Sequence, residues 1–425
     1  MPLTHVVASR ARPVPSVSTM SSLLVLDATH PDGQRVDVVI DSGRITTITP
    51  AGQGRAVATE HAEVVEANGR LVLPAMAEVH AHLDKAFLSE VVPNPTGDLM
   101  GAILAMEAHR HLLGPEETAV RAERAARLIA ANGATAIRTH ADLTAENGLS
   151  SVEVLVDLRD RLRSEGLVDM QVVALCGWPV ADGSSAADEQ VALLRSAIAK
   201  GVDLVGGCPH LEDDHDAAVD VFMAIAADHG LPVDLHMDET LDPRRFALPR
   251  LAEWVLRHRP GVGVTASHCV SLGMQPVEVQ TRTAALVAEA GISVVALPSS
   301  NLFLQGRDHQ QGMPRALTAV AALADAGVTV AAGADNIQDP FNPVGRGDCL
   351  ETASLMVMAG HRLPDDAYES VSGASRAAMG LEPVRLASGS PAELVLLPAA
   401  SIREAVAFGP AGRTVIHGGR VVAGR

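Results

Sequence analysis

Eight short apolar runs, separated by alanine-rich stretches of helical character, dominate the sequence from about residue 70 to 385. Alternation of this kind is typical of βα units that build a parallel sheet. The runs lie at 71–79, 134–139, 170–175, 203–207, 232–235, 262–266, 292–297 and 328–332. Between them, stretches such as 119–131 and 188–199 carry apolar residues near the 3.6-residue helical period. Eight strands with intervening helices predict an α/β fold, the (β/α)8 TIM barrel.

The two ends of the chain have a different character. Short β-rich pieces at 23–26, 36–40 and 45–48 are separated by turn signals, and residues 388–425 repeat this style. We expect 20–70 and 386–425 to pair into one small β-sandwich domain, attached to a barrel at 71–385. Residues 1–19 are rich in proline, serine and valine without a period, which predicts a disordered N-terminal extension. Translation from Met1 and translation from Met20 are both compatible with this pattern.

Charge and composition narrow the classes of partner. The chain has 33 basic and 51 acidic residues, a net charge of −18, which disfavours nucleic acid and anionic membrane surfaces. We therefore expect a small-molecule partner, no nucleic acid and no membrane. No apolar run approaches the roughly 18 to 20 residues that span a bilayer, and residues 1–19 lack a secretory signal pattern. The 4 cysteines are widely spaced without a C-x-x-C pair, which suits reduced thiols, so we expect a cytoplasmic protein.

Histidines concentrate where the predicted strands end. His80 and His82 follow the first run two residues apart, and residues i and i+2 of a strand share a face, so both imidazoles can reach one ion. A His-X-His pair alone is equally compatible with two ordinary histidines. However, six of the 17 histidines lie at strand ends, namely His80, His82, His140, His210, His236 and His268. The carboxyl ends of barrel strands carry the active site in this fold, so the enrichment predicts a metal site there.

Seven motifs in chain order carry a resemblance to a known family. They are His80-Ala81-His82-Leu83-Asp84, Arg138-Thr139-His140-Ala141-Asp142, Pro209-His210-Leu211-Glu212, His236-Met237-Asp238-Glu239, Ser267-His268, Asn301 with Leu304-Gln305-Gly306-Arg307, and Asp335-Asn336 followed by Asp339-Pro340-Phe341. After residue 20 the chain resembles the amidohydrolase superfamily, and within it the cytosine deaminase-like branch. It is also similar to N-isopropylammelide isopropylaminohydrolase. The resemblance implies a metal-dependent hydrolase that acts on C–N bonds other than peptide bonds.

The resemblance also implies one catalytic metal ion. A divalent ion, Zn²⁺ or Fe²⁺, would be held by His80, His82, His236 and Asp335. Metal-bound hydroxide would attack a ring carbon after Asp335 takes a proton from the water, and Glu239 would carry a proton to the neighbouring ring nitrogen. His268 would stabilise the attacking hydroxide or act as a base. Binuclear relatives have a carboxylated lysine after the fourth strand, where this chain has Gly207-Cys208-Pro209, so we expect a single ion.

Several positions predict that the substrate is not cytosine. Cytosine deaminases carry a glutamine after the third strand that binds the pyrimidine edge, and this chain has Gly177 there, which would leave that edge unpaired. Asn336 replaces the aspartate that usually follows the metal-binding aspartate. Lys85 could bind a substrate carbonyl, or it could form an ion pair with a nearby carboxylate. Aromatic residues just beyond strand ends are compatible with a flat apolar pocket for a heterocycle and equally with packing in the core; they are Phe87, Trp178, Phe303 and Phe341.

The expected function is hydrolytic removal of an amino or alkylamino group from a small nitrogen heterocycle, such as a pyrimidine, purine or triazine-like ring. Two alternatives stay open: hydrolysis of a cyclic amide or amidine, and a catalytically silent, metal-binding homologue. Glu239 and His268 argue against the silent homologue, because metal binding alone does not need them. His140 and His210 could instead brace the barrel through hydrogen bonds. Members of the superfamily often assemble into dimers or larger forms, so a homo-oligomer is compatible with the resemblance.

Overall fold

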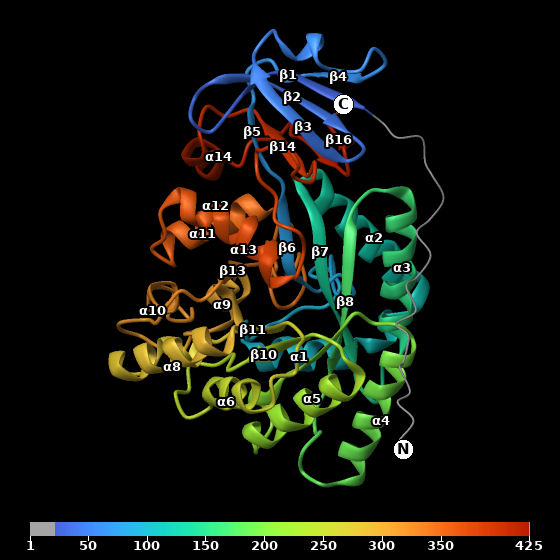
Figure 1. Cartoon of the computed structure of the whole chain (residues 1–425). Helices are drawn as coiled ribbons and strands as arrows, with labels where there is room; N and C mark the ends of the chain where they lie inside the picture. Colours follow the sequence, from blue (N-terminus) through green and yellow to red (C-terminus); the bar gives the residue numbers. More distant parts are fainter. Residues whose placement is uncertain (1–21, 425) are drawn as a thin grey trace, which may run out of the picture.

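The computed structural model describes residues 22–424, and its larger body is a ring of parallel strands. In order around the ring these are β6 (Met76–Ala81), β7 (Ala134–Leu143), β8 (Asp169–Cys176), β9 (Leu204–Gly207), β10 (Val233–Met237), β11 (Val264–His268), β12 (Ser293–Ala296) and β13 (Val330–Ala332). The ring closes where Asp335 N–H donates to the His80 carbonyl (2.9 Å) and His82 N–H donates to the Asp335 carbonyl (3.3 Å). The predicted (β/α)8 barrel is therefore confirmed (Figure 1). The extension predicted at 1–19 lies outside the described residues.

Helices cover the outside of the barrel. The longer ones are α2 (Pro115–Ala131), α3 (Ser150–Glu165), α4 (Ser185–Ala199), α5 (His215–His229), α6 (Leu248–His258), α8 (Val277–Ala290) and α11 (Cys349–Met358), with α10 (Val320–Asp325), α12 (Pro364–Ser370), α13 (Gly373–Ala378) and α14 (Ile402–Phe408) as shorter pieces. Local sequence explains α2: Pro115 occupies its first turn with Glu116 and Glu117, where the helix dipole favours acids. Its buried residues recur at helical spacing, for example Ala122, Ala126 and Ile129.

Short helical segments lie in the loops that follow the strands. They are α1 (Leu99–Ala108), η2 (Arg110–Leu112), η3 (Pro209–Leu211), α7 (Val270–Gly273) and α9 (Pro298–Leu304). The loop that connects β6 to α2 is long, and it holds α1 and η2. In a barrel of this kind the loops at the carboxyl ends of the strands form the mouth, so these segments build the walls of any site there.

A separate small sheet forms from both ends of the chain. Its strands are β1 (Leu23–Thr29), β2 (Arg35–Asp41), β3 (Arg44–Pro50), β4 (Glu63–Glu66), β5 (Leu71–Pro74), β14 (Leu394–Leu397), β15 (Thr414–His417) and β16 (Arg420–Ala423), with η1 (Gly54–Ala56) at its edge. Its order is β16-β15-β14-β5-β1-β2-β3, with β4 paired to β1. Figure 1 shows the N-terminal strands and the C-terminal strands side by side above the barrel. The small β domain built from both chain ends is thus confirmed.

The first apolar run differs from its prediction as one barrel strand. The run divides into β5, which pairs antiparallel with β14, and β6, which pairs with β7 in the barrel. Pro74 lies at the division and has no N–H for a sheet ladder. Immediately after it, the Ala75 N–H donates to the Glu393 carbonyl (2.9 Å). One apolar stretch therefore joins the two sheets and leads directly into the His80 region.

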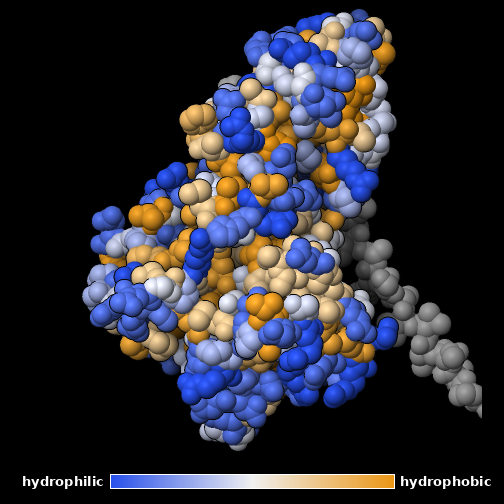
Figure 2. Space-filling model, turned by 90° about the vertical axis from the view of Figure 1, so that its left-hand side faces the viewer, coloured by the Kyte–Doolittle hydropathy of each residue, from blue (hydrophilic) through white to orange (hydrophobic). Residues whose placement is uncertain are grey.

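The surface and the core are consistent with this arrangement. Figure 2 shows that hydrophilic residues cover most of the barrel helices on that face, whereas hydrophobic residues gather between the barrel and the small sheet. The two largest clusters of buried apolar residues lie around the barrel and inside the small sheet. Within residues 22–424, none of the helices combines the length and the apolar character needed to traverse a lipid bilayer.

Candidate active site

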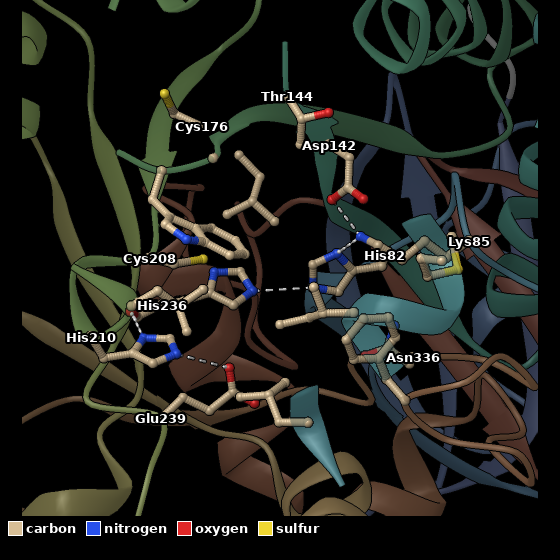
Figure 3. Close-up of a pocket in the computed structure, with 18 of the residues that line it drawn as sticks. His82, Lys85, Asp142, Thr144, Cys176, Cys208, His210, His236, Glu239 and Asn336 are labelled. Atoms are coloured by element: carbon tan, nitrogen blue, oxygen red, sulfur yellow. Dashed lines mark hydrogen bonds and ion pairs between the residues drawn. The ribbon is translucent and has the colours of Figure 1, made fainter. Parts of the chain in front are cut away.

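Four side chains from three parts of the barrel converge at the carboxyl ends of its strands. His80 and His82 come from the end of β6, His236 from the end of β10, and Asp335 follows β13. The Nε2 atoms of His82 and His236 lie 3.2 Å apart. Asp335 Oδ1 lies 3.3 Å from His82 Nε2 and 3.7 Å from His80 Nε2. All four residues are buried, and Figure 3 shows His82 and His236 facing one another across the pocket.

The chemistry of this group fits a cation. His80 Nε2 and Asp335 Oδ1 are buried without any hydrogen-bond partner, and unpaired buried polar atoms are costly unless a ligand or ion completes them. Burial, together with the neighbouring imidazoles, lowers the pKa of His80 and of His236 well below the usual value. Neutral imidazoles keep a lone pair for a metal, so the residues present fit a divalent ion.

Other histidines are as close to His80 as the expected ligands. Among the described residues, two imidazole triads could hold a metal ion, and both contain His80: one adds His236 and His268, the other His82 and His140. The His140 ring is stacked obliquely on the His80 ring at 3.9 Å between centroids. It is fully buried and neither of its nitrogens has a hydrogen-bond partner. The histidine cluster therefore contains more imidazoles than a single ion needs.

The backbone turns sharply where these side chains leave the strands. His268 has φ 69° and Asp335 has φ 65°, a left-handed conformation that is rare for residues other than glycine. His268 is the last residue of β11, and Asp335 lies three residues beyond the end of β13, so both turns lie at the mouth of the barrel. Strained backbone positions of this kind persist only where the surrounding structure holds them in place, and they gather at functional sites.

A carboxyl group and an imidazole face the histidine cluster from one side. Glu239 follows β10 by two residues and is buried; its Oε1 lies 3.4 Å from His268 Nδ1, and its Oε2 lies 3.9 Å from His210 Nε2 (Figure 3). Burial raises the pKa of Glu239 well above its usual range, and nearby Asp335 raises it further. Burial lowers the pKa of His268 to about 4. The pair thus consists of a carboxyl that tends to keep its proton and an imidazole that tends to stay neutral.

Hydrogen bonds behind the cluster orient its rings. His80 Nδ1 pairs with Ser267 Oγ (2.9 Å), which donates to Asp234 Oδ1 (2.6 Å), and Arg138 Nη1 donates to Asp234 Oδ2 (2.8 Å). The three residues behind His80 are buried within the barrel. His210 Nδ1 donates to the His236 carbonyl (3.0 Å), so this histidine braces the strand that carries another member of the cluster. Partners of this kind fix the tautomer and direction of a ligand ring.

Lys85 lies at the opposite side of the pocket from Glu239. Its Nζ is 2.5 Å from Asp142 Oδ1, 3.0 Å from His82 Nδ1 and 3.8 Å from Asp84 Oδ1, and Figure 3 shows the contacts with Asp142 and His82. Although burial opposes it, the carboxylates of Asp142 and Asp84 raise the pKa of Lys85. The ion pair considered as the alternative for Lys85 is therefore present, and its principal partner is Asp142.

The converging groups line one cavity of about 810 Å³, which includes space open to solvent. Of the predicted site residues, all but His80 line it: His82, Lys85, Gly177, Trp178, His236, Glu239, His268, Asp335, Asn336 and Phe341. His80 lies fully buried beside it. The apolar pocket predicted from four aromatic residues holds only in part, because two of them stack on arginines instead. Phe87 packs against Arg124 and Phe303 against Arg307.

Several lining or supporting residues were not singled out from the sequence. Asp142, Thr144, Cys176, Cys208 and Arg110 line the cavity, while Ser267 and Asp234 support it from behind. A signal was present for Asp142, since it ends the Arg138-Thr139-His140-Ala141-Asp142 motif, two residues beyond a histidine. Asn336 does not point freely into the pocket, because its Nδ2 donates to Asp339 Oδ2 (2.7 Å).

Known proteins are similar to this chain in both sequence and fold. A sequence profile described as "Amidohydrolase family" matches residues 94–423. A pterin deaminase of Rhizobium rhizogenes is 35% identical over 97% of this chain and 94% of its own length. An N-isopropylammelide isopropyl amidohydrolase of a Pseudomonas species is 26% identical over 68% of this chain and 69% of its own. The crystal structure of 5-methylcytosine deaminase from Klebsiella pneumoniae with 5-fluorocytosine superposes with a TM-score of 0.84, at 30% identity, covering 95% of this chain and 98% of that one.

Proposed function

This chain belongs to the amidohydrolase family, and we propose that it is a metal-dependent deaminase that hydrolyses the exocyclic C–N bond of a pterin-like heterocycle. Like its relatives, this chain is a hydrolase of C–N bonds other than peptide bonds. One observation supports a pterin ring as the substrate: this chain and the pterin deaminase are similar over nearly the whole length of both.

We assign the metal to His80, His82, His236 and Asp335. The unpaired buried atoms of His80, His236 and Asp335 support a cation at this position. When bound, a zinc or iron ion would supply Lewis acidity that makes a water molecule a nucleophile near neutral pH. A single ion is supported by the end of β9, where binuclear relatives carry a lysine. A Cβ atom at Gly207 would lie 2.2 Å from the Phe222 ring, so a side chain there has no room.

Glu239 is the proton donor in this proposal. Its pKa is raised by burial and by Asp335, so the carboxyl holds a proton that it can pass to the ring nitrogen next to the attacked carbon. His268 accepts a proton or a hydrogen bond through Nε2, which is buried and unpartnered. Its other nitrogen, Nδ1, bonds to Asn301 Oδ1 (3.1 Å), which directs Nε2 into the cavity. The ring carbon keeps the oxygen of the attacking water as a carbonyl. Of the two protons that this water loses, one restores the Glu239 carboxyl and the other passes to the amino group, which leaves as ammonia.

Two aromatic side chains and one ion pair shape the substrate space. Trp178 and Phe341 line the cavity, and flat apolar faces favour a planar ring between them. Lys85 stays bound to Asp142, so its role here is to place positive charge at the pocket wall, where it attracts a substrate carbonyl. Gly177 also lines the cavity and adds no side chain to its wall.

Ammonia release from a panel of heterocycles tests the proposal. The purified protein, reconstituted separately with Zn²⁺ and Fe²⁺, would be assayed with pterin, isoxanthopterin, cytosine, 5-methylcytosine and aminotriazines. We expect deamination of pterin to exceed that of cytosine by at least about 100-fold in kcat/KM, because a site lacking the cytosine-reading amide discriminates by that order. Comparable turnover of cytosine contradicts the pterin assignment. A metal-loaded protein that deaminates nothing in the panel supports the silent homologue instead.

A further inference from the structure

One face of helix α1 forms a wall of the active-site cavity. Leu99, Ile103 and Met106 line the cavity three or four residues apart, and residues at that spacing share one face of a helix. The spacing continues through Glu107 to Arg110, the first residue of η2, and both of these residues also line the cavity. The apolar face of α1 therefore ends in a charged edge, on the wall of the same cavity that the histidine cluster lines.

Arg110 is a basic residue of this cavity that lacks a partner. Within the described residues the cavity wall has one lysine and one arginine, Lys85 and Arg110, and Lys85 Nζ pairs with Asp142 Oδ1 at 2.5 Å. The Arg110 guanidinium belongs to a half-buried residue and makes no hydrogen bond or ion pair within 22–424. Burial raises the pKa of Asp142, and the charge of Arg110 is one of the weaker effects that oppose it. The guanidinium thus lies near that carboxylate without bonding to it.

The other charged side chains of the cavity already have a role or face solvent. Asp335 belongs to the assigned metal ligands, and Glu239 is the proposed proton donor. Glu107 precedes Arg110 by three residues and is exposed, and no ion pair joins the two in the part of the chain that the structure describes. Arg110 is therefore the cation of this wall that is left to interact with a ligand.

The chemistry of a guanidinium favours a carboxylate as that ligand. Its N–H donors form a planar fork that matches the two carboxylate oxygens, and partial burial reduces the screening that weakens such pairs on the open surface. The chain has a net charge of −18, so a free cation on the cavity wall is a local exception that attracts an anion. One guanidinium balances one carboxylate, whereas a phosphate group carries almost two charges near pH 7. Glu107 and Asp142 line the same cavity and oppose that second charge.

We propose that Arg110 is a specificity-determining residue that binds a carboxylate substituent of the heterocyclic substrate. This inference rests on the proposed function for the ring itself, and goes beyond it by naming the substituent, its charge and the residue that binds it. Phe341, one of the two aromatic side chains assigned to the ring, packs against the buried cluster that contains Met106 of α1. The ring therefore lies beside the apolar face of α1, and its substituent reaches the charged end of that face.

Binding of non-reacting probes tests the proposal apart from catalysis. Lumazine, the expected product of pterin deamination, would be compared with lumazine-6-carboxylate and lumazine-7-carboxylate, which carry the anion at the two available ring carbons. Calorimetry would give dissociation constants for the metal-loaded wild-type protein and for Arg110→Gln, which removes the charge but keeps a polar side chain. In wild type one of the two carboxylates should bind at least about 10-fold more tightly than lumazine, and the variant should lose most of this preference.

Two further variants and a second ring control the experiment. Arg282→Gln makes the same chemical change at an exposed arginine of α8 and should keep the wild-type preference. Arg110→Lys keeps the charge without the planar fork, so it should keep part of the preference. Uracil and its carboxylate derivative, orotate, repeat the comparison with a monocyclic ring. Melting temperatures of all variants report folding independently of the probes.

The outcomes separate this inference from the proposed function. A wild-type protein that binds neither the lumazine carboxylates nor orotate more tightly than the uncharged rings overturns the inference. A preference that Arg110→Gln retains also overturns it, because the carboxylate then binds another group, such as the metal ion. An equal loss in Arg282→Gln assigns the effect to total charge and overturns it as well. If the preference depends on Arg110 while no pterin is deaminated, the inference stands and the proposed pterin deaminase activity fails.

Discussion

Two buried carboxyl groups, one at the barrel mouth and one in the small sheet, show how differently the two regions treat polar atoms. Asp37 in β2 is fully buried and accepts backbone N–H groups from Asp27, Gly52 and Gly54, each at 2.8 Å. Glu239 is buried beside two imidazoles at 3.4 and 3.9 Å and accepts no backbone N–H within the described residues. The small sheet satisfies its carboxylate, whereas the mouth leaves its carboxyl available. A buried polar group whose hydrogen bonds are all made stabilises the fold, whereas a buried polar group that lacks partners is a candidate to bind a ligand.

The largest expected effect follows from Glu239→Gln. The change preserves shape but removes the acid, so kcat should fall about 10²- to 10⁴-fold, the range for loss of a general acid. Because burial already favours the neutral carboxyl, a neutral amide should leave the melting temperature and the metal content near wild type. Steady-state kinetics, elemental analysis and thermal denaturation measure the three quantities. Full activity would remove Glu239 from the proposed mechanism.

Ser267→Ala should have the next largest effect. It removes the hydroxyl that connects His80 Nδ1 to Asp234, and loss of such a supporting partner typically weakens metal binding about 10- to 100-fold. Competition with a chromophoric chelator measures the metal affinity directly. Thr265→Val is the matched control: it removes a buried hydroxyl from the same strand that bonds Arg138 (3.1 Å) but does not bond His80. Equal metal affinities in the two variants would contradict an orienting role for Ser267.

The contrast between mouth and sheet also explains what could be predicted from sequence. The barrel could be predicted because each strand is a continuous apolar run in the sequence. The candidate metal ligands could be predicted because the carboxyl ends of the strands face the mouth of the barrel. His80, His82, His236 and Asp335 therefore converge as the motifs implied. The division of the first run at Pro74 was not predicted, because only pairing with β14, over 300 residues later, assigns β5 to the other sheet.

Contacts between distant segments account for the other differences. In the sequence, Ser267 and Asp234 are not distinguished from other strand residues, and only the folded barrel places them behind His80. The aromatic prediction failed for Phe87 because its ring stacks on Arg124 of helix α2. Phe303 is a local exception, since its ring stacks on Arg307, four residues later. Such interactions depend on the register of neighbouring strands and on loop paths, which residue patterns do not encode.

The small sheet should respond in the opposite way to a carboxylate-to-amide change. Asp37→Asn replaces one oxygen with an amino group, and if this is Oδ2, the N–H groups of Gly52 and Gly54 lose their acceptor. A buried group left unpaired costs about 1 to 3 kcal/mol, so urea unfolding should show that loss while kcat/KM of the folded protein stays unchanged. Loss of turnover without loss of stability would mean that the sheet contributes to the site, and the contrast with Glu239 would fail.

The smallest effect concerns an ion pair at the edge of the same sheet. His417 Nδ1 lies 2.7 Å from Glu393 Oε2, and Oε1 accepts the Gly418 N–H (2.9 Å). Burial alone would lower the pKa of His417, but the Glu393 carboxylate outweighs it and raises the pKa. A raised folded-state pKa contributes stability that is complete below the unfolded value of about 6.5 and disappears as the pH rises through the folded value.

Glu393→Gln isolates that contribution. The wild type should be more stable than the variant at pH 6, by on the order of 1 kcal/mol, and the difference should shrink as the pH is raised above the folded pKa of His417. Urea unfolding at pH 6, 7, 8 and 9 measures it. A difference that does not change with pH would assign the loss to the Gly418 hydrogen bond instead of the imidazolium. Either way turnover at the mouth should be unaffected, because Glu393, His417 and Gly418 bond one another at the small sheet.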